Sequence, residues 1–82
     1  MTKIIVINNM FDKDQNILVY KDNQMITSVN AELDELVDVV KSLASQYSIR
    51  TIDLVGNENF LTQFKNNFSS EFNQYTVNII SR

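Results

Sequence analysis

The spacing of apolar residues predicts three short strands in the first part of the chain. Residues 4–7 form a continuous β-branched run, which is typical of a strand buried on both faces. Residues 17–20 and 25–29 predict two further strands. The intervening residues 10–16 are mostly polar, and residues 21–24 should make a tight turn because Asp and Asn tolerate left-handed backbone angles. Short strands joined by short polar turns predict an antiparallel meander.

The hydrophobic period then changes from 2 to 3.6, which predicts a helix ending near Tyr47. The apolar positions that share one helical face are Leu33, Leu36, Val37, Val40, Leu43, Ala44 and Tyr47. Asn30 is the expected N-cap, because its side chain can accept a hydrogen bond from the exposed amides of the first turn. Acidic residues at 32, 34 and 35 would then lie at the positive end of the helix dipole.

The rest of the chain predicts a strand, a second helix and a last strand. Residues 49–55 form the fourth strand, and Gly56 ends it. Phe60, Phe64 and Phe68 recur at helical spacing, so they should pack on the sheet in a shorter helix capped by Asn57. Residues 75–80 close the chain as a fifth strand.

These seven elements predict a two-layer α/β fold. The expected sheet is mixed and five-stranded, with spatial order 3-2-1-4-5 and with strand 2 antiparallel. Both strand–helix–strand crossovers run in the same direction along the sheet, and both must be right-handed, so both helices are expected on one face. The opposite face is then left without a covering element. Alternation places Thr51, Asp53 and Val55 there from strand 4, with Thr76, Asn78 and Ile80 from strand 5 and about four aliphatic or aromatic residues from strands 1 and 2.

Composition narrows the chemistry that this single 82-residue domain can perform. The chain contains no His, Cys, Pro or Trp, which excludes disulfides, zinc sites of the usual ligands and nucleophiles activated by an imidazole. We expect no cofactor. The net charge of -3 gives no basic stripe for nucleic acid, and an acidic mimic of nucleic acid would need a denser acidic face. The longest apolar run at the N-terminus has four residues, so we expect no membrane contact and a cytoplasmic protein.

The order of elements resembles the ribonuclease H-like architecture. The segments that carry the resemblance are IIVIN (residues 4–8), ITSV (26–29) and IDLVGN (52–57) followed by Phe60. The chain is also similar to small uncharacterised proteins of tailed phages. Resemblance to the nucleases of this architecture implies two metal ions held by acidic residues in strand 1, on the first helix and at the end of strand 4.

The catalytic carboxylates of such nucleases are not matched here. Strand 1 offers no acid before Asn8, and Asp53 lies two residues before the end of strand 4. Glu32 and Glu35 on the first helix are expected to face no acidic partner. The run that begins at Asp12 matches the first ligands of a calcium-binding EF-hand loop but lacks its glycine and its glutamate, so it predicts a hairpin turn. We therefore expect neither a metal site nor an enzyme.

Two groups of residues are candidates for binding. Asn8 and Asn9 end strand 1, and Gly56 and Asn57 end strand 4, so these amides should meet at the edge where open α/β sheets bind ligands. Alternatively, they are turn and capping residues that bond their own backbone.

The uncovered face gives the second group: Asp53, Val55, Asn78 and Ile80 are candidate interface residues. Phe72 joins them because it has drifted around the second helix. An ordinary solvated sheet face is the alternative.

The sequence thus favours a small non-catalytic accessory protein that acts through protein–protein contact. The expected partner is a second copy, bound through the bare face or an edge strand, or else another protein. The alternative is a small-ligand-binding or degenerate ribonuclease H-like module that uses the edge formed by Asn8, Asn9, Gly56 and Asn57.

Overall fold

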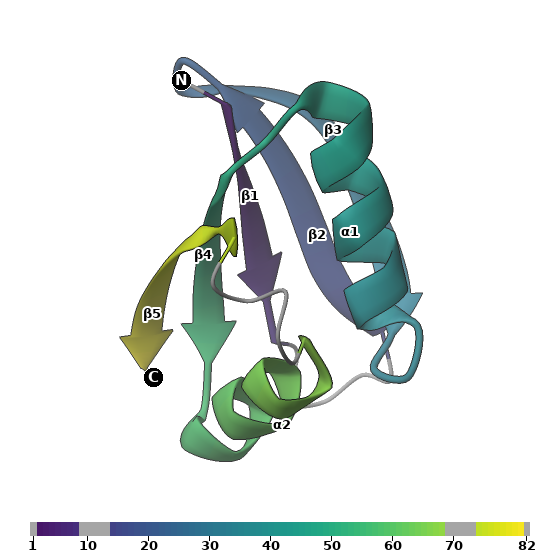
Figure 1. The fold of residues 1–82 in the computed structure, drawn as a ribbon, viewed down its shortest axis with the longest axis vertical. Coiled ribbons are helices and arrows are strands. Elements are labelled where there is room, and N and C mark those ends of the chain that lie inside the picture. The colour runs from purple at the N-terminus through teal and green to yellow at the C-terminus, as the bar shows by residue number, and fades with distance from the viewer. Residues whose placement is uncertain (1, 9–13, 69–73, 82) are drawn as a thin grey trace.

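The computed structural model, which describes residues 2–8, 14–68 and 74–81, confirms the predicted order of elements (Figure 1). The elements are β1 (Thr2–Ile7), β2 (Asp14–Lys21), β3 (Gln24–Glu32), α1 (Leu36–Tyr47), β4 (Thr51–Gly56), α2 (Glu58–Phe68) and β5 (Thr76–Ser81). The five strands form one sheet in the predicted order β3-β2-β1-β4-β5. β2 runs antiparallel to β1 and β3, whereas β1, β4 and β5 are parallel.

The turn between β2 and β3 has the expected left-handed backbone. Asp22 and Asn23 have φ angles of 52° and 67°. Two successive residues with positive φ produce the turn whose twist matches that of paired strands, and Asn and Asp tolerate this backbone better than other side chains. This turn sets the register in which Lys21 pairs with Gln24.

The core lies between the two helices and one face of the sheet. Along each strand the core residues alternate with residues of the other face. Six of them are fully buried: Ile4, Val6, Ile17, Val19, Ile52 and Leu54. Leu36 and Val40 of α1 and the three predicted phenylalanines of α2 pack against them. In Figure 1, α1 lies in front of β2 and β3, and α2 lies beside the ends of β1 and β4. One layer of helix on one layer of sheet is therefore the architecture.

The phenylalanines of α2 form a continuous stack. The ring centroids of Phe60 and Phe64 are 6.2 Å apart, and those of Phe64 and Phe68 are 5.4 Å apart. Tyr75, just before β5, meets Phe68 edge-on at 5.3 Å, and the Lys41 ammonium of α1 lies 5.6 Å from the centre of the same ring. Aromatic contacts in these geometries stabilise packing beyond the area that they bury, so the stack fixes α2 between α1 and β5.

The start of α1 differs from the prediction. Asn30 is not an N-cap, because β3 continues to Glu32 and pairs with β2 through Asn30–Asn16 and Glu32–Asp14. A turn follows, and α1 begins at Leu36 after Glu35, whose side chain makes no capping bond. Strand pairing satisfies the backbone groups of residues 30–32, which a local helix signal does not take into account.

Two smaller predictions are also corrected. The first strand is fully buried on one face only: Ile4 and Val6 are buried, whereas Ile5 and Ile7 are half-buried. The fourth and fifth strands begin later than expected, so that Ile49 and Tyr75 precede β4 and β5. Ile49 is nevertheless buried in the core, where its position just after α1 explains its apolar character.

Candidate functional site

Three of the four predicted edge residues come together at the ends of β1 and β4. The Asn8 amide donates a hydrogen bond of 2.8 Å to the Val55 carbonyl, which continues the parallel pairing of the two strands. A Cβ atom at Gly56 would lie 2.7 Å from Cβ of Asn8 and 2.7 Å from Cδ2 of Phe60. Gly56 is therefore a position where the backbone of β4, the end of β1 and the first turn of α2 approach closely. Asn9 lies outside the described residues.

The polar groups at this edge are mostly engaged with one another. Nδ2 of Asn8 donates to Oε1 of Gln15 at 2.7 Å, and Gln15 is only 4% exposed. Oδ1 of Asn57 accepts a 2.8 Å hydrogen bond from the Phe60 amide, so Asn57 caps α2 as predicted. Oδ1 of Asn8 is buried and has no hydrogen-bond partner among the described residues. Because a buried unpaired acceptor is costly, this oxygen is a group that invites a donor.

The predicted open face is present in the described part of the chain: its residues alternate with the buried core residues, and no described helix packs on it. Strand register arranges these residues in rows across the sheet. One row is Ser28, Leu18, Ile5, Asp53 and Asn78, and the next is Asn30, Asn16, Ile7, Val55 and Ile80. We call this surface the open face.

Leu18, Ile5, Ile7, Val55 and Ile80 form a continuous diagonal across the open face, which we call the apolar band. The band contains two of the predicted interface residues, Val55 and Ile80, and Ile80 is 50% exposed. Its polar flank contains the other two: Oδ1 of Asp53 accepts a 2.9 Å bond from Nδ2 of Asn78, and Oδ2 lies 3.2 Å from the Lys3 ammonium. Phe72 lies outside the described residues.

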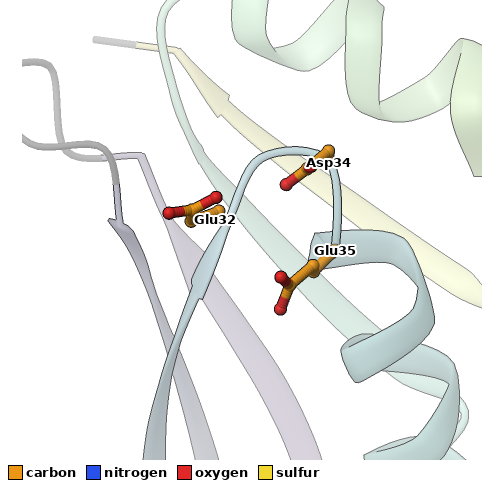
Figure 2. Close-up of side chains that lie close together, drawn as sticks. All are labelled: Glu32, Asp34 and Glu35. Atoms are coloured by element: carbon orange, nitrogen blue, oxygen red, sulfur yellow. The ribbon is translucent and has the colours of Figure 1, made fainter.

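Three carboxylates gather in the turn between β3 and α1, a feature that the sequence analysis missed (Figure 2). Oxygen atoms of Glu32, Asp34 and Glu35 lie within 4.8 Å of one another. The expectation that Glu32 and Glu35 would face no acid was wrong, because it assumed that both were already helical. All three residues are exposed, and no acid of β1 joins them. Water can solvate such a cluster, so by itself it is a charged turn.

A cavity at the amino-terminal ends of β4 and β5 was also not predicted. It has a volume of about 300 Å³ and lies at the end of α1, with Ser45, Ser48, Arg50, Gln74 and Tyr75 among its lining residues. Arg50 is the charged residue among the described lining residues, and a cation of this kind attracts anions. The carbonyl end of a helix, in contrast, favours cations over anions. These two tendencies oppose each other, and the cavity does not define a ligand class.

Comparisons with known proteins identify a shared fold. The chain is similar in structure to a protein of unknown function with an actin-like ATPase fold from Bacteroides thetaiotaomicron VPI-5482, with a TM-score of 0.69 and 13% sequence identity. The match covers 96% of this chain and 32% of that protein, so the chain spans about a third of its length. At this identity the likeness shows the fold alone. The sequence matches no protein-family model and no curated protein.

None of the helices in the described ranges is both long and apolar enough to cross a bilayer.

The close approach at Gly56 gives a direct test of this edge. Gly56→Ala should lower the free energy of unfolding by about 1–3 kcal/mol, the usual cost of overpacking, because its methyl group meets both Asn8 and Phe60. Urea denaturation followed by circular dichroism measures this change. Ser42→Ala, on the exposed side of α1, is the matched control and should leave stability within about 0.5 kcal/mol. Equal stability of the two variants would contradict the packing described here.

Proposed function

We propose that this protein is non-catalytic and acts through protein–protein contact, and that its open face binds the open face of a second copy. The observation that supports the proposal is the apolar band on a sheet face that no described helix covers. Contiguous apolar surface of this kind usually marks an interaction site. A non-catalytic role is supported by the sequence, which offers neither His nor Cys and places no acid on β1.

The size of the open face suits a small symmetric interface. Five strands at the usual spacing and about six residues per strand give a surface of about 24 Å by about 20 Å. Two such surfaces stacked together contribute about 960 Å² in total, which is close to the lower limit of about 1,000 Å² for a specific interface. A weak homodimer is therefore what the area supports.

The charges on the open face also suit a second copy. Lys3 and Asp53 are the charged residues within the three rows from Lys3 to Ile7, and they neutralise each other at 3.2 Å. The protein as a whole carries a charge of -3 and repels its copies at long range. A face without net charge adds no local repulsion to that of the whole protein, so two copies can approach there.

A matched pair of substitutions on β5 tests whether two copies associate through the open face. Ile80 lies on the open face opposite Val55, whereas Ile79 points to the helix side, and the two are similarly exposed at 50% and 53%. Ile80→Lys should weaken self-association at least about tenfold, because each dimer would bury two unpaired ammonium groups. Ile79→Lys should associate like the unmodified protein.

Sedimentation equilibrium from 10 µM to 1 mM gives the dissociation constants, and circular dichroism confirms that both variants are folded. Monomeric unmodified protein over this whole range would overturn self-association. Equal weakening by the two variants would show that the open face is not the surface involved. A heterologous protein bound with the same dependence on Ile80 would identify the face correctly but assign it a different partner.

A second candidate function is supported by Oδ1 of Asn8, which has no partner in the described part of the chain. This acceptor lies at the carboxyl end of β1 beside the capped first turn of α2, so a ligand that donates a hydrogen bond there, or a divalent cation that the oxygen coordinates, would satisfy it. Under this alternative, 1 mM ADP or 5 mM MgCl₂ should raise the melting temperature by several degrees, as stabilisation by a ligand far above its dissociation constant does. Asn8→Ala should abolish the shift. No shift with either probe would remove this candidate.

A further inference from the structure

The outer edge of β3 is a second surface that is built for contact. β3 is nine residues long and pairs with β2 on one side, while no described strand lies on its other side. An edge strand offers a row of unpaired N–H and C=O groups to any extended segment that reaches it. The length of this edge makes it the largest such template in the described sheet, since β5 at the other edge has six residues.

The sequence of β3 lacks the charged and proline residues that usually protect an edge. Residues 24–31 include no charged residue and no proline, and the first charge after the turn is Glu32 at the end of the strand. Met25 and Ile26 are 54% and 44% exposed. Edge strands normally carry lysine, inward-pointing charge or proline that discourages pairing between chains. The absence of such residues over eight positions indicates that the edge of β3 permits pairing with a strand of another chain.

We propose that β3 pairs antiparallel with β3 of a second copy, with the twofold axis passing between the two Ser28 residues. In this register Thr27 lies opposite Val29, and Ser28 is the middle residue of β3, so the overlap of the two strands is the largest that any axis allows. The central pairs bring no charged residues together, so charge does not oppose this axis.

The irregularity in β3 is compatible with this pairing. The register with β2 shifts between Val19 and Tyr20, opposite Met25 to Thr27, and is regular from Thr27 to Glu32. The three central pairs of the proposed junction involve residues 27, 28 and 29, which lie within the regular part. A bulge at each end twists the strand there and limits the pairing to its centre.

This proposal is independent of the proposed function, because it rests on the strand edge and not on the open face. An axis through Ser28 is perpendicular to the sheet, so both open faces would remain accessible on the same side of a ten-stranded sheet. Stacking of open faces uses an axis within the plane of the sheet. The two contacts do not exclude each other, and each can fail without the other.

Cysteine crosslinking tests the register directly, because the natural chain contains no Cys. Thr27 and Val29 are half-buried on the helix side of β3, so stacking of open faces cannot bring them together. Residues that lie opposite each other in an antiparallel pair have Cβ atoms about 5 Å apart, within reach of a disulfide after small adjustments. A mixture of Thr27→Cys and Val29→Cys proteins, one of them labelled with ¹⁵N, is oxidised at 100 µM, and the disulfide-linked dimers are identified by intact mass.

The proposed register predicts that the mixed Thr27→Cys/Val29→Cys dimer exceeds either homodimer at least tenfold. Random collision would give the three species in a ratio of about 1:2:1, as a mixture of labelled and unlabelled Ser42→Cys proteins should, and that result would overturn the proposal. Dominant self-linking of either β3 variant would place the axis elsewhere and also overturn it. Repeating the experiment in the Ile80→Lys background separates the two contacts, since mixed crosslinking should persist when stacking is blocked.

Discussion

The handedness of the two strand–helix–strand crossovers is the constraint on which the rest of the molecule depends. The chain leaves β3 for β4 and then β4 for β5, and both steps move in the same direction across the sheet. A right-handed connection in each step places both helices on the same side. The core can therefore form on one face of the sheet, where the fully buried residues of β1, β2 and β4 meet α1 and α2. The apolar band on the other face follows from the same constraint, because β1 and β2 carry apolar residues on both sides.

Local chemistry refines this arrangement at two places, the carboxyl ends of β1 and β4 and the outer strand β3. At the carboxyl end, Gly56 allows β1, β4 and α2 to approach within contact distance, and Asn57 terminates α2 with a side-chain cap. At the outer edge, β3 stays paired with β2 up to Glu32 and is followed by the acidic turn of Figure 2. The likeness to an actin-like ATPase fold concerns this arrangement of elements and not its side chains, which share 13% identity with that protein.

Much of the fold could be predicted because its signals are local. The change of period after residue 30, the Phe60–Phe64–Phe68 spacing and the Asp22–Asn23 turn each depend on a few neighbouring residues. The start of α1 could not be predicted in this way. Asn30 and Glu32 pair with Asn16 and Asp14 of β2, which lie 14 and 18 positions earlier in the chain, so no local signal contains this pairing. The Asn8–Gln15 hydrogen bond and the gathering of three carboxylates depend on the same extension of the strands. Sequence reasoning therefore identified the candidate edge and the Asn57 cap but not the pairing of Asn8 with Gln15.

The isoleucines allow the most direct measurement of the central claim, that one face of the sheet is open. Ile4, Ile17 and Ile52 are fully buried on the helix side, whereas Ile5 and Ile7 lie on the open face. Proteins labelled at the isoleucine δ1 methyl groups can be titrated with a soluble gadolinium chelate in the Ile80→Lys background, which is expected to disfavour the proposed stacking. The account predicts that the methyl protons of Ile5 and Ile7 relax several times faster than those of Ile4, Ile17 and Ile52. Equal shielding of both sets would show that the second face is covered and would contradict the account.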